Sequence, residues 1–187
     1  MREAKVAPSH SGYRTLTHDQ RLAATTPAAR PGHSPLCAYH DSICLETEAP
    51  LQFVDFTKHL AEVVRASGIR TGFVNVQTRH TTTAVMVNEN EPLLQEDMRR
   101  VLERLAPPHH SYRHDDFSIR TVNLCPDEDK NGHSHCKAIF LRTSETLNIA
   151  QGEIQLGQWQ RVFLIELDRG KKRTVSVLVM GEGSEGS

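Results

Sequence analysis

Strand-like segments follow one another along most of this chain, and their order limits the folds that it can adopt. β-Branched residues dominate the stretch from Ile69 to Asn90, which predicts two strands separated by a turn near 79–82. Other segments show strand-like alternation or short apolar runs, at 36–47, 139–143, 162–167 and 175–179. Runs of strands with helices only between the early ones are typical of α+β folds, so we expect about seven strands in antiparallel sheets and about two helices.

The first helix is predicted after Asp55, a residue suited to capping a helix. The apolar residues that follow recur at the spacing of one helix face, at Phe56, Leu60, Val63 and Val64. Gly68 then supplies a stop signal.

The second helix is predicted over 92–105, because Pro92 suits the first helical position. Its expected buried stripe consists of Leu94, Met98, Val101, Leu102 and Leu105. Asp97 falls on that same face, where a carboxylate must be paired or must face a polar cavity. An ion pair with Arg100 or Arg104 is the simpler alternative.

The stretch from Asn131 to Gln160 combines polar side chains with turn-forming glycines. If residues 133–137 are extended, His133, His135 and Lys137 share one face of a strand. That face could hold a ligand, or it could simply be the solvated end of the strand.

Composition and charge limit the kinds of partner and the cellular compartment that suit this chain. The chain has 187 residues and a formal net charge of −1, so no broad basic surface for nucleic acid or membrane is expected. No apolar run approaches the roughly 20 residues that span a bilayer. Four cysteines without a secretory signal suggest free thiols in a reducing compartment, the cytoplasm.

Residues 1–35 differ from the rest because they are poor in acids and show no periodicity. We expect a disordered extension there, with an organellar import signal as the weaker alternative. A single domain over 36–182 and a flexible end at 183–187 complete the expected organisation.

Two polar regions are candidates for a site. One runs along the second strand of the 69–90 stretch, from His80 to Asn88 and Glu89. The other is the loop HHSYRHDD, which contains His114 and Asp115. Each has an ordinary explanation as well, since Asn and Glu are common in turns and charged loops are usually solvated.

Several motifs in one order resemble the YjbQ-like family of secondary thiamine-phosphate synthases. The motifs are HTTTAVMVNENEP, the helix with Asp97, YRHDD, GHSHCKA, GEIQLGQWQRVFLIE and VSVLVMGE. The resemblance covers roughly 36–182. It implies a two-sheet antiparallel sandwich that trimerises about a threefold axis, with polar pockets near the subunit boundary.

The resemblance also implies site residues. His80, Glu89, Asp97 and His135 match motif positions and are the expected catalytic residues. His114 and Asp115 match the histidine and acid that follow the tyrosine of the loop motif.

The implied reaction joins a pyrimidine methyl pyrophosphate to a thiazole phosphate and releases pyrophosphate. Such a site must hold negative charge, so Asn88, Lys137, Arg142 and Arg161 are the expected ligands of a small-molecule phosphate substrate. Glu89, Asp97 and Asp115 could bind Mg²⁺ through oxygen.

Other functions remain open from the residues alone. His80, His114, Asp115 and His135 form a possible metal set for Mg²⁺ or Zn²⁺, which would suit a metal-dependent hydrolase. A structural zinc site at Cys125, His133, His135 and Cys136 has poor spacing. A homotrimer that binds a small anion without turnover is a third possibility.

Overall fold

The structure is a computed structural model that describes residues 36–126 and 128–183. The expected extension over 1–35 and almost all of the expected flexible end lie outside the described residues. Of the helices in these two ranges, none has the length and apolar character needed to span a bilayer. All four cysteines lie in these ranges, and they form no disulfide there, as predicted.

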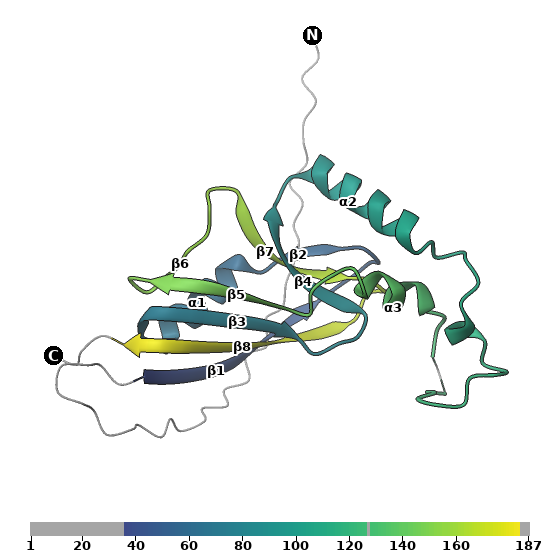
Figure 1. The fold of residues 1–187 in the computed structure, drawn as a ribbon, viewed down its shortest axis with the longest axis horizontal. Helices are drawn as coiled ribbons and strands as arrows, with labels where there is room; N and C mark the ends of the chain where they lie inside the picture. The colour runs from purple at the N-terminus through teal and green to yellow at the C-terminus, as the bar shows by residue number, and fades with distance from the viewer. Residues whose placement is uncertain (1–35, 127, 184–187) are drawn as a thin grey trace, which may run out of the picture.

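A five-stranded antiparallel sheet forms the larger layer (Figure 1). In spatial order its strands are β1 (Leu36–Glu46), β8 (Lys172–Gly183), β3 (Ile69–Thr78), β5 (Ser144–Ala150) and β6 (Glu153–Ile154). β1 lies at one edge, as its mixed polarity predicts. The strand expected at 139–143 begins later, at Ser144.

A three-stranded antiparallel sheet forms the second layer. Its strands in spatial order are β2 (Phe53–Asp55), β7 (Gln160–Glu166) and β4 (Thr83–Glu89). β7 is buried on both faces, because Val162 and Leu164 enter one hydrophobic cluster while Phe163 and Ile165 enter another. Burial on both faces explains why this strand is a continuous apolar run in the sequence.

Helix α1 (Thr57–Ser67) forms where it is predicted, although its N-cap residue is Phe56 and not Asp55. Asp55 accepts hydrogen bonds from both the backbone nitrogen and the hydroxyl of Thr57, at 3.0 and 2.6 Å. Leu60 is buried in the core between the sheets together with Val63 and Val64. Gly68 ends the helix with φ of 69°, a conformation that glycine adopts without strain.

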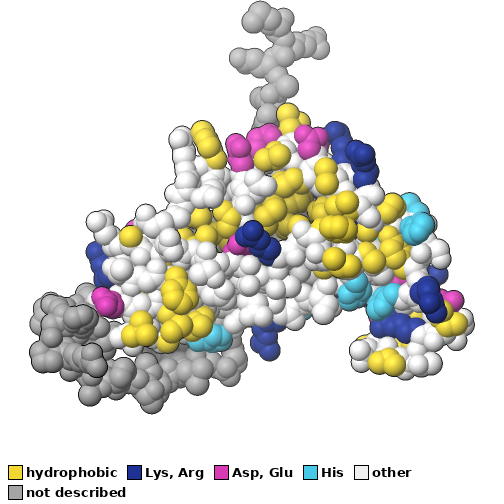
Figure 2. All heavy atoms as spheres, in the orientation of Figure 1, with side chains coloured by type: hydrophobic (Ala, Val, Ile, Leu, Met, Phe, Trp, Pro, Cys, Tyr) yellow, Lys and Arg dark blue, Asp and Glu magenta, His cyan; other side chains and the backbone are white. Residues whose placement is uncertain are grey.

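Helix α2 (Pro92–Leu105) begins as predicted, but its apolar stripe is largely open. Glu91 caps it by accepting from the backbone nitrogens of Leu93 and Leu94 at 3.0 and 2.6 Å. Only Leu102 is buried, whereas Val101 is 54% exposed and much of the stripe faces a groove. The helix extends past the small sheet, so hydrophobic side chains gather on this face of the molecule (Figures 1 and 2).

The segment around His133 and His135 is a helix, α3 (Gly132–Ala138), and the strand prediction is wrong. The segment contains no β-branched residue, and its polar alternation does not exclude a helix. Asp115 accepts from the backbone nitrogens of Asn131 and Gly132 at 3.0 and 2.8 Å, which satisfies the helix start. The described chain therefore has three α-helices and eight strands, more than expected.

Candidate functional site

A cavity of about 580 Å³ lies where the chain passes between the two sheets. Three of the connections between the sheets lie close together: 47–52, 79–82 and 167–171. They are hydrogen-bonded to one another, since Leu167 donates its backbone N–H to Thr82 and Thr47 donates to Lys171, both at 3.0 Å. The connections 79–82 and 167–171 line one side of the cavity, and the loop before α3 lines the other.

The cavity is lined mainly by cations and imidazoles. Among the described residues around it are the basic side chains of Arg79, Arg120, Arg169, Lys171 and Arg173 and the histidines His80, His114 and His135. A volume of this size suits a small-molecule ligand.

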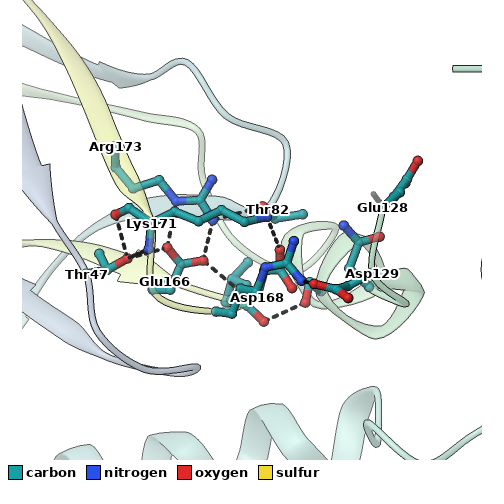
Figure 3. A network of polar contacts seen from close by, with 12 residues as sticks. Thr47, Thr82, Glu128, Asp129, Glu166, Asp168, Lys171 and Arg173 are labelled. Atoms are coloured by element: carbon teal, nitrogen blue, oxygen red, sulfur yellow. Dashed lines mark hydrogen bonds and ion pairs between the residues drawn. The ribbon is translucent and has the colours of Figure 1, made fainter. Parts of the chain in front are cut away.

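A buried ion pair forms the base of the site. Glu166 accepts from Nε and Nη2 of Arg173 at 2.6 and 2.5 Å, and from the hydroxyl of Thr47 at 2.8 Å (Figure 3). Both members of the pair are buried. Because the two carboxylate oxygens hold the Nε–Nη2 edge of the guanidinium, the orientation of Arg173 is fixed.

That orientation leaves one amino group of Arg173 for a ligand. Nη2 also donates to the hydroxyl of Thr82 at 3.3 Å, and Nε is taken by Glu166. Within the described ranges Nη1 has no hydrogen-bond partner, and Arg173 lines the cavity.

His80 is held by the backbone of β8. Its Nε2 accepts the backbone N–H of Thr174 at 2.9 Å. Burial, and then the Arg173 guanidinium, lower the pKa of His80 below its ordinary value, so the neutral ring is favoured at neutral pH.

His114 and His135 face each other on the opposite side. Their ring centroids are 4.7 Å apart in an edge-to-face arrangement, with His114 on the short 3₁₀ helix η1 (Arg113–Asp115). Nε2 of His114 lies 3.7 Å from Oε1 of Glu128. Burial, and then the neighbouring His114, lower the pKa of His135.

Arg120 stabilises the loop that carries these histidines. It donates to Glu128 at 2.6 Å and to the backbone carbonyls of His114, Val122 and Asn123. The hydrogen bond from Arg120 lowers the pKa of Glu128. Arg120 is therefore occupied by its own loop.

Three of the predicted catalytic and binding residues lie away from this cavity. Asp97 pairs with Arg100 at 3.2 Å on an exposed part of α2, which is the simpler alternative considered for it. Asn88 donates to the sulfur of Met98 at 3.4 Å, and Glu89 is exposed at the end of β4. The structure does not bring these residues together with His80 and His135.

The predicted phosphate ligands also point elsewhere. Lys137 is buried, and its ammonium donates to the carbonyl of Ala106 at 2.6 Å, so it does not line the cavity. Arg142 pairs with Glu145 at 3.0 Å on the surface. Arg161 donates to the carbonyls of Gln158 and Gln160.

The predicted metal ligands do not fit a metal ion. Asp115 caps α3, and Nε2 of His80 is occupied by a backbone N–H. The described residues contain no group of three or more His, Cys, Asp or Glu side chains placed to hold a metal. This set of residues therefore does not support a site for Mg²⁺ or Zn²⁺. The set Cys125, His133, His135 and Cys136 does not support a zinc site either.

Sequence reasoning missed Glu166 and Arg173. Arg173 shares parity with Val175, Val177 and Val179, so its side chain is on the inward face of β8. Glu166 ends a strand whose other inner residues are apolar. A charge at an inward position of each of two consecutive strands was the available signal for a buried ion pair.

Comparisons with known proteins agree on one family. The family model described as "UPF0047 protein YjbQ-like" matches residues 41–182. A UPF0047 protein of Methanothermobacter thermautotrophicus is 35% identical, over 77% of this chain and 93% of its own length. A second, from Archaeoglobus fulgidus, is 33% identical over 72% and 96%.

Solved structures show the same fold. A YbjQ-like protein of unknown function from Sulfolobus solfataricus P2 superposes with a TM-score of 0.70 at 30% identity, covering 79% of this chain and 99% of its own. A hypothetical protein from Aeropyrum pernix K1 gives 0.67 at 31% identity, covering 76% and 98%.

Proposed function

This chain belongs to the YjbQ-like UPF0047 family, and on that premise we propose that it is a transferase of the thiamine-phosphate-synthase type. Its substrate is a small molecule that carries phosphate, and its site is the cavity beside the connections between the two sheets. The gathering of basic side chains and imidazoles around that one cavity is the observation that supports this proposal.

In this reaction the protein mainly has to stabilise the negative charge of the departing pyrophosphate. The ring nitrogen of the thiazole attacks the methylene carbon of the pyrimidine, a C–N bond forms, and the C–O bond to pyrophosphate breaks. The electron pair leaves with pyrophosphate, and no proton is removed from the attacking nitrogen. Fixed cations and hydrogen-bond donors beside the departing oxygen lower such a barrier.

The side chains around the cavity suit that task. Arg173 presents a buried and oriented cation, and Arg79 adds an exposed one. Binding by a preoriented guanidinium costs little side-chain entropy, because Glu166 already holds it.

The test is product formation from the two thiamine precursors by the purified full chain. We expect Arg79→Ala to lower the rate about 100-fold or more. Arg65→Ala, which removes an exposed arginine from α1, should keep the wild-type rate and serves as the matched control. No product from the wild-type chain under any ionic condition would overturn the proposal and favour an anion-binding protein without turnover.

Magnesium is varied in the same assay. The described residues offer no ligand set for a resident ion, so a strict requirement for Mg²⁺ would mean that the ion enters with the pyrophosphate. The metal-dependent hydrolase, the other enzyme considered, predicts instead that stoichiometric metal copurifies with the chain.

The open apolar face of α2 supports assembly of the chain, which the family resemblance predicts to be a homotrimer. Val101 is 54% exposed and Leu105 48%, and Phe140 beside them is 60% exposed. We propose that a second copy of the chain covers this groove, since a patch of this kind usually marks an interface. Light scattering on Val101→Glu should then report a smaller particle than on wild type.

A cytoplasmic location completes the proposal. Four cysteines that form no disulfide in the described ranges suit a reducing compartment.

A further inference from the structure

We infer that Arg79, His80 and Arg173 form a phosphate subsite in which His80 acts as a neutral hydrogen-bond donor through Nδ1. The subsite deepens the proposed function by assigning the place of the anionic group. It also makes an independent claim, because it should bind inorganic phosphate whether or not the chain forms product.

Arg173 provides the fixed charge of the subsite. Its side chain is 5% exposed and lines the cavity, and Glu166 and Thr82 take its Nε and Nη2. In the part of the chain that the structure describes, Nη1 is left without a protein partner. A buried guanidinium with one free amino group toward a cavity is a ready donor to a phosphate oxygen.

The tautomer of His80 follows from its contact with Thr174. A backbone N–H can only donate, so Nε2 must accept and must be unprotonated. The single ring proton therefore lies on Nδ1. Among the described residues Nδ1 has no hydrogen-bond partner, and the ring borders the cavity.

Charge around the ring opposes its protonation. Burial and then the charges of Arg173, Arg79 and Lys171 disfavour an imidazolium, whereas Glu166 favours it. Protonation of Nε2 would also remove the bond to Thr174. His80 thus offers one neutral donor, unlike a histidine that binds phosphate as a cation.

Arg79 supplies the charge that is least compensated. Three other cations of the cavity pair with carboxylates: Arg120 with Glu128, Lys171 with Asp168 and Arg169 with Asp129. In the described ranges Arg79 has no ion pair. It adjoins His80, and its backbone N–H donates to the carbonyl of Thr174 at 3.4 Å.

A phosphate anion is the ligand class that this arrangement favours. Two guanidinium groups and a neutral N–H match the several acceptor oxygens of a terminal phosphate. A neutral ligand would leave the Arg79 charge without a partner.

The first experiment titrates inorganic phosphate into the full chain by calorimetry at pH 7.5. We expect Arg79→Ala to weaken binding about tenfold or more, because a charge-assisted contact is lost. Arg65→Ala should bind as wild type does. Equal binding by wild type and Arg79→Ala, or no binding by wild type, would overturn the subsite.

The second experiment concerns His80 itself. Nitrogen NMR of the ring should show protonated Nδ1 and unprotonated Nε2 at pH 7.5, and either an imidazolium or the other tautomer would overturn the donor role. His80→Asn places an amide near Nδ1, whereas His80→Gln reaches toward Nε2. We expect the Asn variant to bind phosphate several-fold more tightly than the Gln variant.

The outcomes separate the two proposals. Phosphate binding that depends on Arg79, without thiamine phosphate product, would leave the subsite standing and remove the proposed reaction. Product formation that is unaffected by Arg79→Ala and by added phosphate would keep the reaction and remove the subsite.

Discussion

Lys137 places its ammonium 2.6 Å from the carbonyl oxygen of Ala106 and is 1% exposed. This contact ties the last turn of α3 to the C-cap residue of α2. Burial lowers the pKa of Lys137, as expected for an ammonium removed from water. Lys137 therefore makes a structural contact in the fold, whereas the sequence analysis predicts that it binds phosphate.

Lys137→Ala should lower the free energy of unfolding by about 2–4 kcal/mol, because the buried stem is lost and the carbonyl of Ala106 loses its donor. Lys137→Met keeps most of the stem and serves as the control, with a loss of about 1 kcal/mol. Urea titrations measure both. Equal losses for the two variants would contradict the role of the stem.

Asp115→Ala should destabilise the protein by about 1–2 kcal/mol, since α3 loses the acceptor at its first turn. Asp115→Asn keeps an acceptor oxygen and should lose less. Thermal unfolding measured with Mg²⁺, with Zn²⁺ and with a chelator provides the comparison. A loss seen only when metal is present would show that Asp115 is a metal ligand after all.

Glu166→Gln should cost about 3–5 kcal/mol, because a buried guanidinium loses its charged partner. The double variant Glu166→Gln, Arg173→Met should recover part of that loss. Denaturant unfolding of wild type, both single variants and the double variant gives the coupling between the two side chains. A coupling near zero would mean that the pair contributes nothing.

Stability should fall as the pH drops from about 7 to 5. Burial is the first cause that lowers the pKa of His80, His133 and His135 in the folded protein. The unfolded chain then binds more protons than the native one below about pH 6.5, so the free energy of unfolding rises with pH through this window. Melting temperatures at several pH values check this, and His135→Gln should show a shallower slope.

Sequence reasoning succeeded where local and long-range signals agree. The cap at Asp55, the apolar face through Leu60 and the stop at Gly68 all point to one helix, and α1 forms there. β7 and β8 are likewise recognisable, because apolar continuity and strict alternation are direct results of how many faces are buried.

The same reasoning failed where contacts between residues far apart in the sequence determine the local structure. Residues 132–138 alternate in polarity, but Asp115 and the carbonyl of Leu167, which accepts from Ser134 at 2.6 Å, hold them as a helix. The amphipathic pattern of α2 correctly predicts a helix, yet it does not say whether the chain itself covers the apolar stripe. No local pattern shows that His80 and Thr174 come together.

The connections 47–52, 79–82 and 167–171 make the cavity depend on the correct assembly of both sheets. Neither sheet alone contains the site, since the backbone contacts of Leu167 with Thr82 and of Thr47 with Lys171 arise only when both are in place. A ligand would therefore bind only to a chain in which the two sheets are packed together. Phosphate binding should slow amide hydrogen exchange in both β7 and β8. A partly folded chain with only one intact sheet should not bind phosphate.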